Sequence, residues 1–263
     1  MDDRPTLDAL IQANRERIES RLYAQRVRET GEEARRKALA DPREIAGVIE
    51  NVELHADASE DVLKAYCADA RRCKFVAVSV NPCQVGYVAR ALAGSGVRVG
   101  GVVSFPFGAA TPEIKAAEAL DSIRRGAVEL DMVMNIGALK SGDDQLVLED
   151  IQGVVAVAMP TGVVVKVILE TGYLTDEEKI RACILIEAAG ADFVKTSTGF
   201  GPGVATVEDV QLMRAVVGDR LGVKAAGGVR SLETALTMLR AGATRLGARV
   251  GGDIVAEAQA LAG

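Results

Sequence analysis

The stretch that decides the fold is Val163-Val164-Val165-Lys166-Val167-Ile168-Leu169, which is apolar at every position except one lysine. A strand with one solvated face alternates apolar and polar residues, whereas a parallel strand covered on both faces is apolar throughout. The run Val76-Ala77-Val78 has the same character. Both stretches therefore predict buried parallel strands.

Similar runs recur from about residue 46 onward, each followed by a segment with helical periodicity and charged faces. They are spaced roughly 22 to 35 residues apart, the length of one strand-loop-helix unit. Eight such units close naturally into a barrel. The predicted strands are 46–52, 75–80, 97–103, 127–134, 163–169, 193–196, 222–226 and 245–248.

A doubly wound open sheet would share these apolar runs, but the chain has no Gly-x-Gly-x-x-Gly after its first predicted strand. The helical segments have ordinary boundaries. A capped start is predicted at Thr175, and stops are predicted at Gly190 and Gly242. The fold class predicted is therefore α/β, a (β/α)8 barrel.

The composition is that of a globular protein with an acidic balance. Apolar residues make up 49% of the 263 residues and charged residues 26%, with a formal net charge of −6. Phosphate backbones need a concentrated basic surface, so a nucleic-acid partner is not expected. The basic cluster at 15–36 is interleaved with glutamates and is interpreted as a solvated helix face. The chain lacks a long apolar run and a signal-peptide pattern, which predicts a cytoplasmic protein without a membrane partner.

The few cysteines and the single histidine argue against a disulfide framework, a zinc site and a Ser-His hydrolase. The four cysteines have no CxxC spacing and are interpreted as reduced thiols, mostly in the core. The single histidine, His55, argues against a zinc-dependent aldolase and against a Ser-His hydrolase, because both need placed imidazoles. No metal and no cofactor are expected.

The segment 1–44 falls outside the barrel scheme and is predicted to be an N-terminal helical extension of the barrel domain at 45–263. Its apolar stripe runs from Leu7 to Leu22 at helical spacing. The extension is interpreted as a helix packed on the barrel or on a neighbouring subunit. An alternative is a docking segment for a shell or scaffold partner, as in a protein-shelled compartment. The exposed stripe also favours a homodimer over a monomer.

Functional groups of a barrel lie at the C-terminal ends of its strands, where this sequence places three lysines and one aspartate. They are Asp131, Lys166, Lys195 and Lys224. An amine attacks a carbonyl only when it is unprotonated, and a free lysine has a pKa of about 10.4. A second ammonium and partial desolvation lower that pKa. We therefore expect Schiff-base chemistry, with one lysine forming the iminium, another tuning its pKa and a carboxylate with water moving protons.

A glycine-rich loop predicts a site for an anion. The run Gly227-Gly228-Val229-Arg230 lies between the seventh predicted strand and a helix that opens at Ser231. Backbone N–H groups and a helix dipole can hold a phosphate there. Gly199 and Gly247 follow or end neighbouring strands and are candidates to contribute. Phosphate sites of barrels favour these loops.

Several motifs between about residues 46 and 250 closely resemble the deoxyribose-phosphate aldolase family of class I aldolases. The motifs are Val80-Asn81-Pro82, Val103-Ser104-Phe105-Pro106-Phe107-Gly108, Glu129-Leu130-Asp131-Met132-Val133, Lys166-Val167-Ile168-Leu169-Glu170-Thr171, Asp192-Phe193-Val194-Lys195-Thr196-Ser197-Thr198-Gly199 and Lys224-Ala225-Ala226-Gly227-Gly228-Val229-Arg230.

This resemblance implies reversible cleavage of 2-deoxyribose 5-phosphate to acetaldehyde and glyceraldehyde 3-phosphate. It implies that Lys195 forms the imine and that Lys224 lowers its pKa. Asp131 with a water would move protons, and Lys166 would support Asp131. The phosphate would rest on Gly199, Gly227, Gly228, Val229, Arg230 and Gly247.

The chain departs from the family pattern at two places that concern substrate recognition. Where the family usually has Ile-Asp-His-Thr-Leu, this chain has Ile49-Glu50-Asn51-Val52-Glu53, so a hydroxyl is missing at Val52 while Glu50 is expected to reach Lys224. Where the family supplies serines near the last strand, this chain has Arg249. Arg249 either binds phosphate as a bidentate cation or turns outward.

Three alternatives remain open at the level of sequence. The first is an aldolase with a different acceptor, which the altered recognition residues favour. The second is another Schiff-base barrel enzyme, such as a transaldolase or a different sugar-phosphate lyase. The third is a non-catalytic barrel that serves as a scaffold through its N-terminal helix, against which the presence of Lys195, Lys224 and Asp131 argues.

Overall fold

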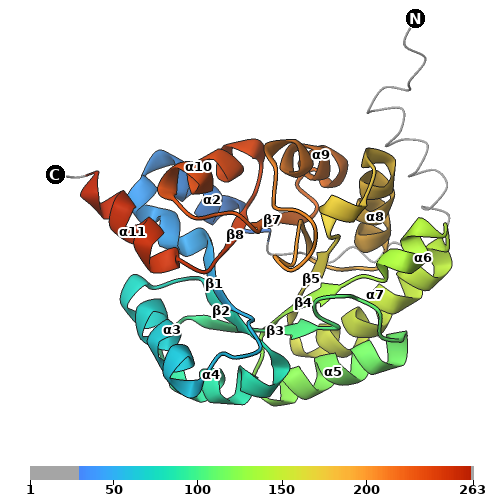
Figure 1. Ribbon diagram of the computed structural model, residues 1–263, viewed down its shortest axis with the longest axis horizontal. Helices are drawn as coiled ribbons and strands as arrows, with labels where there is room; N and C mark the ends of the chain where they lie inside the picture. Colours follow the sequence, from blue (N-terminus) through green and yellow to red (C-terminus); the bar gives the residue numbers. More distant parts are fainter. Residues whose placement is uncertain (1–29, 262–263) are drawn as a thin grey trace, which may run out of the picture.

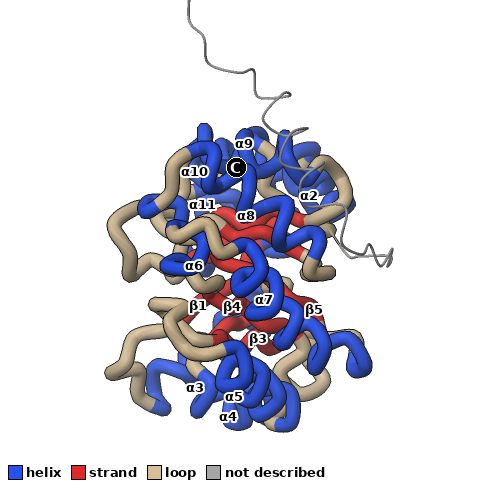
Figure 2. Tube along the Cα trace, turned by 90° about the vertical axis from the view of Figure 1, so that its right-hand side faces the viewer, coloured by secondary structure: helices blue, strands red, loops and turns tan. Residues whose placement is uncertain are grey.

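The computed structural model, which describes residues 30–261, is a closed barrel of parallel strands surrounded by helices (Figure 1). The strands follow one another around the barrel in sequence order, and β1 (Ile49–Glu53) pairs with β8 (Arg245–Ala248) to close it. Figure 2 shows the strands enclosed between helices. The predicted (β/α)8 barrel is confirmed.

Each predicted strand is present, with ends that differ from the prediction by a few residues at most. The other strands are β2 (Ala77–Val80), β3 (Arg98–Val103), β4 (Glu129–Val133), β5 (Val164–Ile168), β6 (Phe193–Lys195) and β7 (Gly222–Ala226). The helices described are α2 (Glu32–Ala40), α3 (Glu60–Cys73), α4 (Val85–Ala91), α5 (Pro112–Arg124), α6 (Ile136–Lys140), α7 (Asp144–Ala158), α8 (Asp176–Ala188), α9 (Val207–Val217), α10 (Leu232–Ala241) and α11 (Gly251–Ala260).

The first strand starts later than the sequence pattern predicts. The apolar run was expected to be extended from residue 46, but Pro42–Val48 form a 3-10 helix and the strand begins at Ile49. Pro42 supplies the fixed φ that a helical first turn needs, and the Asp41 side chain accepts a hydrogen bond from the Arg43 N–H. Local capping therefore outweighs the apolar character of residues 46–48.

The predicted helix boundaries agree with the structure because the capping groups are in place. Thr175 and Glu178 form a capping box at the start of α8, and the Ser231 side chain accepts from the Thr234 N–H at the start of α10. Gly190 and Gly242 adopt positive φ values of 88° and 118°, which glycine tolerates without strain. These turns return the chain to β6 and β8.

The described part of the predicted extension packs against the end of the barrel where the strands begin. Arg35 of α2 donates to the Leu239 carbonyl of α10 at 2.8 Å. A Cβ on Gly31 would lie 3.0 Å from the carbonyl oxygen of Thr244, the residue just before β8. The apolar stripe at 7–22 lies outside the described residues, and the boundary between 44 and 45 stays a prediction.

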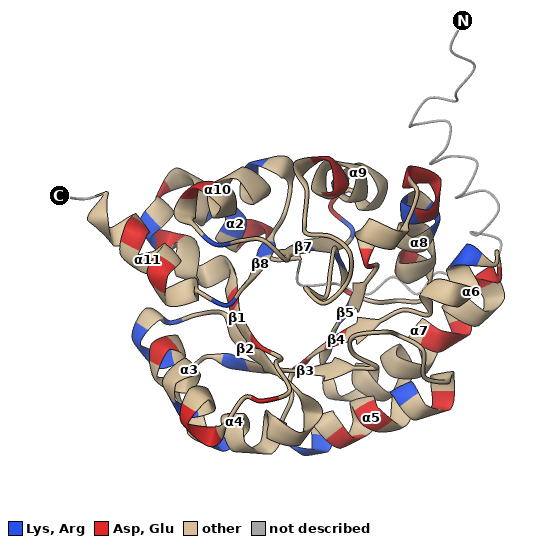
Figure 3. Cartoon of the chain, viewed as in Figure 1, with Lys and Arg blue, Asp and Glu red and all other residues tan. Residues whose placement is uncertain are grey.

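Charged residues of both signs are distributed over the outer helices (Figure 3). Among the cysteines, Cys67 and Cys183 are buried, Cys73 is partly buried and Cys83 is exposed, so Cys83 is an exception to the core interpretation. Within residues 30–261, no helix is long and apolar enough to cross a membrane.

A buried ion pair behind β4 fixes the loop that follows this strand. The Lys115 ammonium lies 2.6 Å from Asp150 Oδ2 and donates to the Val133 carbonyl at 2.9 Å. The same Asp150 oxygen accepts from the Asn135 N–H at 3.1 Å. Burial lowers the pKa of Lys115 and raises that of Asp150, while the partner opposes each shift. The pair ties α5 and α7 to the end of β4.

Lys115→Met is expected to lower the free energy of unfolding by about 3–5 kcal/mol, because it leaves the Asp150 carboxylate buried without its cation. Urea unfolding followed by circular dichroism measures the loss. In the double variant Lys115→Met/Asp150→Leu, much of the stability should return, since no unpaired charge remains. A single-variant loss below about 1 kcal/mol would contradict this account of the pair.

Candidate active site

Four neighbouring strands bring the predicted chemical residues together inside the barrel. Asp131 of β4 is in register with Lys166 of β5, and Lys195 of β6 is in register with Lys224 of β7. All four are at most 2% exposed to solvent. Because adjacent parallel strands carry in-register side chains on the same face, the four groups converge in the lumen.

Asp131 is the centre of this cluster. Its Oδ2 lies 2.6 Å from Lys195 Nζ and 2.7 Å from Lys224 Nζ, and its Oδ1 lies 3.1 Å from Lys166 Nζ. Burial alone would raise the pKa of Asp131, but the attraction of the three lysines holds it well below its usual value. The carboxylate therefore stays ionised and bridges the two amines.

Lys195 has the property that amine chemistry requires. Burial lowers the pKa of its ammonium, Asp131 opposes the shift, and the nearby Lys224 ammonium lowers it further, to about 8. The sequence interpretation assigned the shift to a second ammonium and partial desolvation. In the structure, burial is the larger cause and Lys224 adds to it.

Lys166 differs from Lys195 because more carboxylates surround it. Its Nζ also bonds the Glu129 carboxylate and lies 3.2 Å from Glu50 Oε2. Burial lowers the pKa of Lys166, but Asp131, Glu129 and Glu50 together raise it above the ordinary value. Lys166 is therefore an ammonium at every working pH and is a poor nucleophile.

The rate of imine formation with acetaldehyde is expected to rise about tenfold per pH unit up to a midpoint near 8 and to level off above it. The sign follows from the amine, which reacts only after it loses its proton, while Asp131 stays ionised over this range. Cyanoborohydride trapping at a series of pH values, quantified by intact mass, measures the profile. A midpoint near the ordinary lysine value of about 10.4 would contradict the lowered pKa.

A layer of charged groups lies below the reactive lysine. The Glu50 carboxylate bonds Lys224, as the sequence predicts, and Arg245 Nη1 lies 3.5 Å from Glu50 Oε1 and 3.6 Å from Glu129 Oε1. This layer contains three buried carboxylates, which are Glu50, Glu129 and Asp131. Apart from Lys195, it contains three buried cations, which are Lys166, Lys224 and Arg245. A neutral Lys195 leaves these buried groups without net charge.

Sequence reasoning did not find Glu129 and Arg245 as members of this layer. Glu129 lies two residues before Asp131 on the same strand, so both side chains point to the same face. That spacing was a usable signal. For Arg245 the only signal was a charged residue within a predicted strand.

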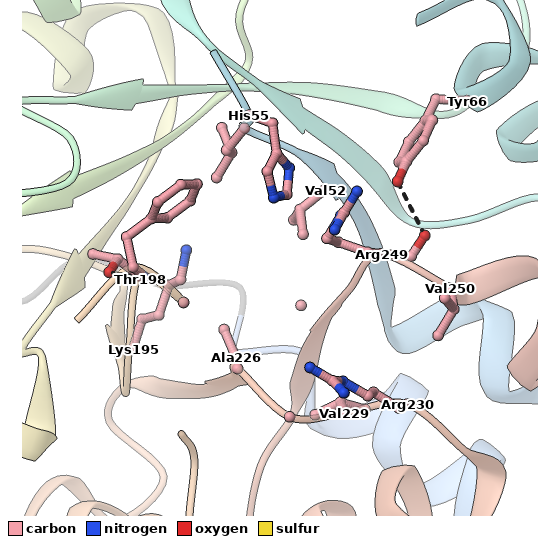
Figure 4. Close-up of a pocket in the computed structure, with 16 residues that line it drawn as sticks. Val52, His55, Tyr66, Lys195, Thr198, Ala226, Val229, Arg230, Arg249 and Val250 are labelled. Carbon is pink, nitrogen blue, oxygen red and sulfur yellow. Dashed lines mark hydrogen bonds between the residues drawn. The ribbon is translucent and has the colours of Figure 1, made fainter. Parts of the chain in front are cut away.

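A cavity of about 580 Å³ opens above Lys195 at the C-terminal ends of the strands (Figure 4). All residues predicted to hold phosphate line it together with Lys195, whereas Asp131, Lys166 and Lys224 lie beneath it. The predicted phosphate residues are Gly199, Gly227, Gly228, Val229, Arg230, Gly247 and Arg249. Figure 4 shows Lys195 on one side of the cavity and Arg230 and Arg249 on the other.

The wall opposite Lys195 is suited to an anion. Among the residues that the structure describes, no Asp or Glu lines the cavity, while Arg230 and Arg249 do. Gly227 and Gly228 have φ values of 90° and 83°, a conformation that glycine adopts freely and that brings the backbone close to a ligand. Arg249 lines the cavity but leans toward Glu53, with its Nη2 3.5 Å from Glu53 Oε2.

No group of three or more His, Cys, Asp or Glu side chains in the described part of the chain is arranged to hold a metal ion. His55 lies at the cavity wall, where its Nδ1 is 2.8 Å from Glu53 Oε1. The buried charged groups nearest Lys195 are amines and carboxylates.

A closed parallel barrel with a buried lysine of lowered pKa below a cavity at its strand ends is the arrangement of a class I aldolase. The family model described as DeoC/LacD family aldolase matches residues 48–257, and the chain belongs to this family.

The chain is also similar in sequence and structure to named aldolases. The chain is 51% identical over 215 residues to the deoxyribose-phosphate aldolase of Aciduliprofundum boonei, which covers 82% of this chain and 97% of the relative. The same identity and coverage hold for the deoxyribose-phosphate aldolase of Enterococcus faecalis. A solved tetrameric deoxyribose-phosphate aldolase from Aeropyrum pernix superposes with a TM-score of 0.80 at 28% identity, covering 88% of this chain and 98% of that one.

Proposed function

We propose that this protein is a class I aldolase that reversibly cleaves 2-deoxy-D-ribose 5-phosphate to acetaldehyde and glyceraldehyde 3-phosphate through an imine at Lys195. The observation that carries the proposal is Lys195 Nζ, buried with a pKa of about 8 and 2.6 Å from Asp131 Oδ2, beneath a cavity whose far wall is cationic. The names of the relatives support the choice of substrate.

In this mechanism the neutral Lys195 amine attacks the C1 carbonyl carbon of the open-chain sugar phosphate, and loss of water gives the iminium. The C3 hydroxyl then loses its proton, the C2–C3 bond breaks, and its electron pair moves into the iminium to give an enamine. Glyceraldehyde 3-phosphate leaves. A proton adds to C2 of the enamine, and water hydrolyses the resulting iminium to acetaldehyde and free Lys195.

Three neighbours of Lys195 would transfer protons, lower its pKa and position the carboxylate. Asp131, which contacts both amines, would pass protons to and from the reacting atoms through a water. Lys224 would keep the pKa of Lys195 low, because a second ammonium so close disfavours a charged Lys195. Lys166 would hold the other oxygen of Asp131 and fix the carboxylate in place.

The phosphate would bind at the wall opposite Lys195, on the backbone of Gly199, Gly227, Gly228, Val229 and Gly247 with the side chains of Arg230 and Arg249.

Arg230→Gln is expected to raise the KM for 2-deoxyribose 5-phosphate by about 10- to 100-fold, since a hydrogen bond between charged groups is lost, with a smaller effect on kcat. Turnover of unphosphorylated 2-deoxyribose should not change. Initial rates with both sugars provide the measurement. Arg240→Gln, on the exposed side of α10, is the matched control. An equal effect on both sugars would show that Arg230 does not bind the phosphate.

A second candidate is an aldolase of the same mechanism with a different phosphorylated acceptor. Val52 gives this cavity an apolar side chain on β1, and Arg249 adds a cation at the end of β8. Incubation with acetaldehyde and a panel of phosphorylated aldehydes, followed by product mass analysis, separates the two candidates. A rate with glyceraldehyde 3-phosphate far below that with another acceptor would favour the second.

The main proposal is tested by incubating the protein with 2-deoxyribose 5-phosphate and measuring both products. Acetaldehyde is quantified with alcohol dehydrogenase and NADH, and glyceraldehyde 3-phosphate by its own dehydrogenase. Equal amounts of the two products support the proposal. Release of another aldehyde pair would indicate a different sugar-phosphate lyase or a transaldolase.

For assembly and location we propose a cytoplasmic homodimer in which the N-terminal helical extension packs on the barrel or on a neighbouring subunit, with docking to a shell or scaffold partner as the alternative. The apolar stripe at 7–22 in the sequence supports both ideas. Light scattering on the full chain and on a variant that lacks residues 1–29, which keeps α2 on the barrel, measures the contribution of the apolar stripe to assembly. Unchanged mass and unchanged partner binding would remove the proposal for the segment.

A further inference from the structure

At the seam where β1 meets β8, a buried carboxylate holds an imidazole in a fixed orientation. Glu53, the last residue of β1, is 2% exposed. Its Oε1 accepts from the His55 backbone N–H at 3.0 Å and lies 2.8 Å from His55 Nδ1. Burial raises the pKa of Glu53, but these two bonds and Arg249 outweigh it and lower the pKa, so the group is a carboxylate. Nδ1 therefore carries the proton that faces Glu53.

The opposite ring nitrogen, Nε2, is left for a ligand. His55 lines the same cavity as Lys195, and Figure 4 shows its ring projecting into that cavity. No hydrogen bond to Nε2 is found within residues 30–261. With Nδ1 as the donor to Glu53, Nε2 of the neutral ring is an acceptor.

Aromatic packing restricts the ring from the other side. The Phe200 ring lies 5.5 Å from that of His55, centroid to centroid, and Phe200 in turn packs edge-on against Phe105 at 5.4 Å. His55 is thus held by a carboxylate at one edge and an aromatic ring at its flank. A side chain restrained in this way binds a ligand group with little loss of entropy.

The other polar side chains of the cavity are already engaged or are cations. The Tyr66 hydroxyl donates to the Arg249 carbonyl at 3.2 Å, and the Thr198 hydroxyl bonds the Glu170 carboxylate. Lys195, Arg230 and Arg249 carry charge, and β1 contributes only apolar Val52 beside them. His55 is therefore the lining side chain that offers an uncommitted acceptor to a neutral hydroxyl.

We propose that His55, oriented by Glu53, is a specificity-determining residue that accepts a hydrogen bond from the hydroxyl group next to the carbonyl of the acceptor aldehyde. This inference rests on the proposed aldolase function. The acceptor of that function, glyceraldehyde 3-phosphate, carries this hydroxyl. The donor half is held by Lys195, the phosphate by the opposite wall, and the hydroxyl between the carbonyl and the phosphate by His55.

The test compares two acceptors in the synthesis direction with acetaldehyde as donor. One is glyceraldehyde 3-phosphate, and the other is 3-phosphooxypropanal, which differs only by lacking the hydroxyl. The native protein is expected to prefer the hydroxylated acceptor in kcat/KM by about tenfold. His55→Ala should reduce this preference to near one, mostly by slowing the reaction of the hydroxylated acceptor.

Further variants separate recognition from a loss of folding. His55→Gln, whose amide reaches close to the position of Nε2, should keep part of the preference. Glu53→Gln should weaken it, because the ring loses its anionic anchor. Tyr87→Phe removes a hydroxyl from α4, outside this cavity, and should keep the native ratio. In each variant, trapping of an ethyl adduct at Lys195 with acetaldehyde and borohydride shows that the imine site is intact.

The outcomes are distinct. An adduct at Lys195 with an unchanged acceptor ratio in both His55→Ala and Glu53→Gln overturns the role of His55 and leaves the proposed function standing. Absence of the adduct in the native protein overturns the proposed function and this inference with it. A ratio that collapses in His55→Ala, is partly kept in His55→Gln and is native in Tyr87→Phe supports the assignment.

Discussion

Lys195→Leu is expected to lower turnover of 2-deoxyribose 5-phosphate by about 10⁴-fold or more, because the amine that lines the cavity and forms the imine is gone. Lys166 is not a substitute, since its pKa is raised, and Lys224 bonds both Glu50 and Asp131 below the cavity. Leucine keeps much of the buried volume, so the barrel should still fold. The coupled assay for acetaldehyde measures the loss.

Two controls define this result. Lys64→Leu removes an exposed lysine of α3 and should leave turnover unchanged. Circular dichroism should give the same spectrum for Lys195→Leu as for the native protein. If Lys195→Leu keeps more than about a tenth of native turnover, Lys195 is not the nucleophile and the mechanism is wrong.

Asp131→Asn should separate imine formation from bond cleavage. The amide keeps the shape of the side chain but cannot take a proton from the substrate, so turnover is expected to fall by about 10²- to 10⁴-fold. The negative charge that raises the pKa of Lys195 is also lost, so this pKa should fall below its native value of about 8. Imine formation should therefore persist and extend to lower pH.

Trapping rates and turnover are measured on the same preparation of Asp131→Asn. Asp121→Asn, which pairs with Arg125 on the exposed surface of α5, is a matched control and should match the native protein in both. A parallel loss of trapping and turnover would mean that Asp131 is needed to build the site and not to move protons. Full turnover would exclude Asp131 from the reaction.

The barrel was predictable because its strands leave a strong local signal. Residues 163–169, apart from Lys166, and residues 76–78 are apolar on successive positions, as parallel strands covered on both faces require. The spacing of the units then limits the topology. The beginning of the first strand was not predictable in the same way, because the turn at Pro42 competes with an apolar run at 46–48.

The reactive cluster was also predictable, because Asp131, Lys166, Lys195 and Lys224 each stand out as charges within or beside apolar strands. The contacts among Glu53, His55 and Arg249 at the cavity wall were not predictable from the sequence. Arg249, which contacts the Glu53 carboxylate, is 196 positions away from it along the chain. The two meet only because β8 closes against β1, and no local pattern records which side chains face each other across that seam.

At the cavity wall opposite Lys195, the sequence predicted which residues line the cavity but not the direction of the Arg249 side chain. The predicted glycines, Arg230 and Arg249 all line one cavity with Lys195. Sequence left open whether Arg249 faces the ligand or turns outward. In the structure its guanidinium is drawn toward Glu53 while it still borders the cavity, so its direction depends on a carboxylate that the sequence interpretation did not consider.

The most direct test of the central claim is borohydride reduction in the presence of acetaldehyde, followed by intact mass and peptide mapping. One ethyl group per chain is expected, carried by the peptide that contains Lys195, and none on Lys195→Leu. An ethyl group on Lys166 or Lys224 instead, or no adduct on folded native protein, would contradict the assignment of Lys195 as the imine-forming residue.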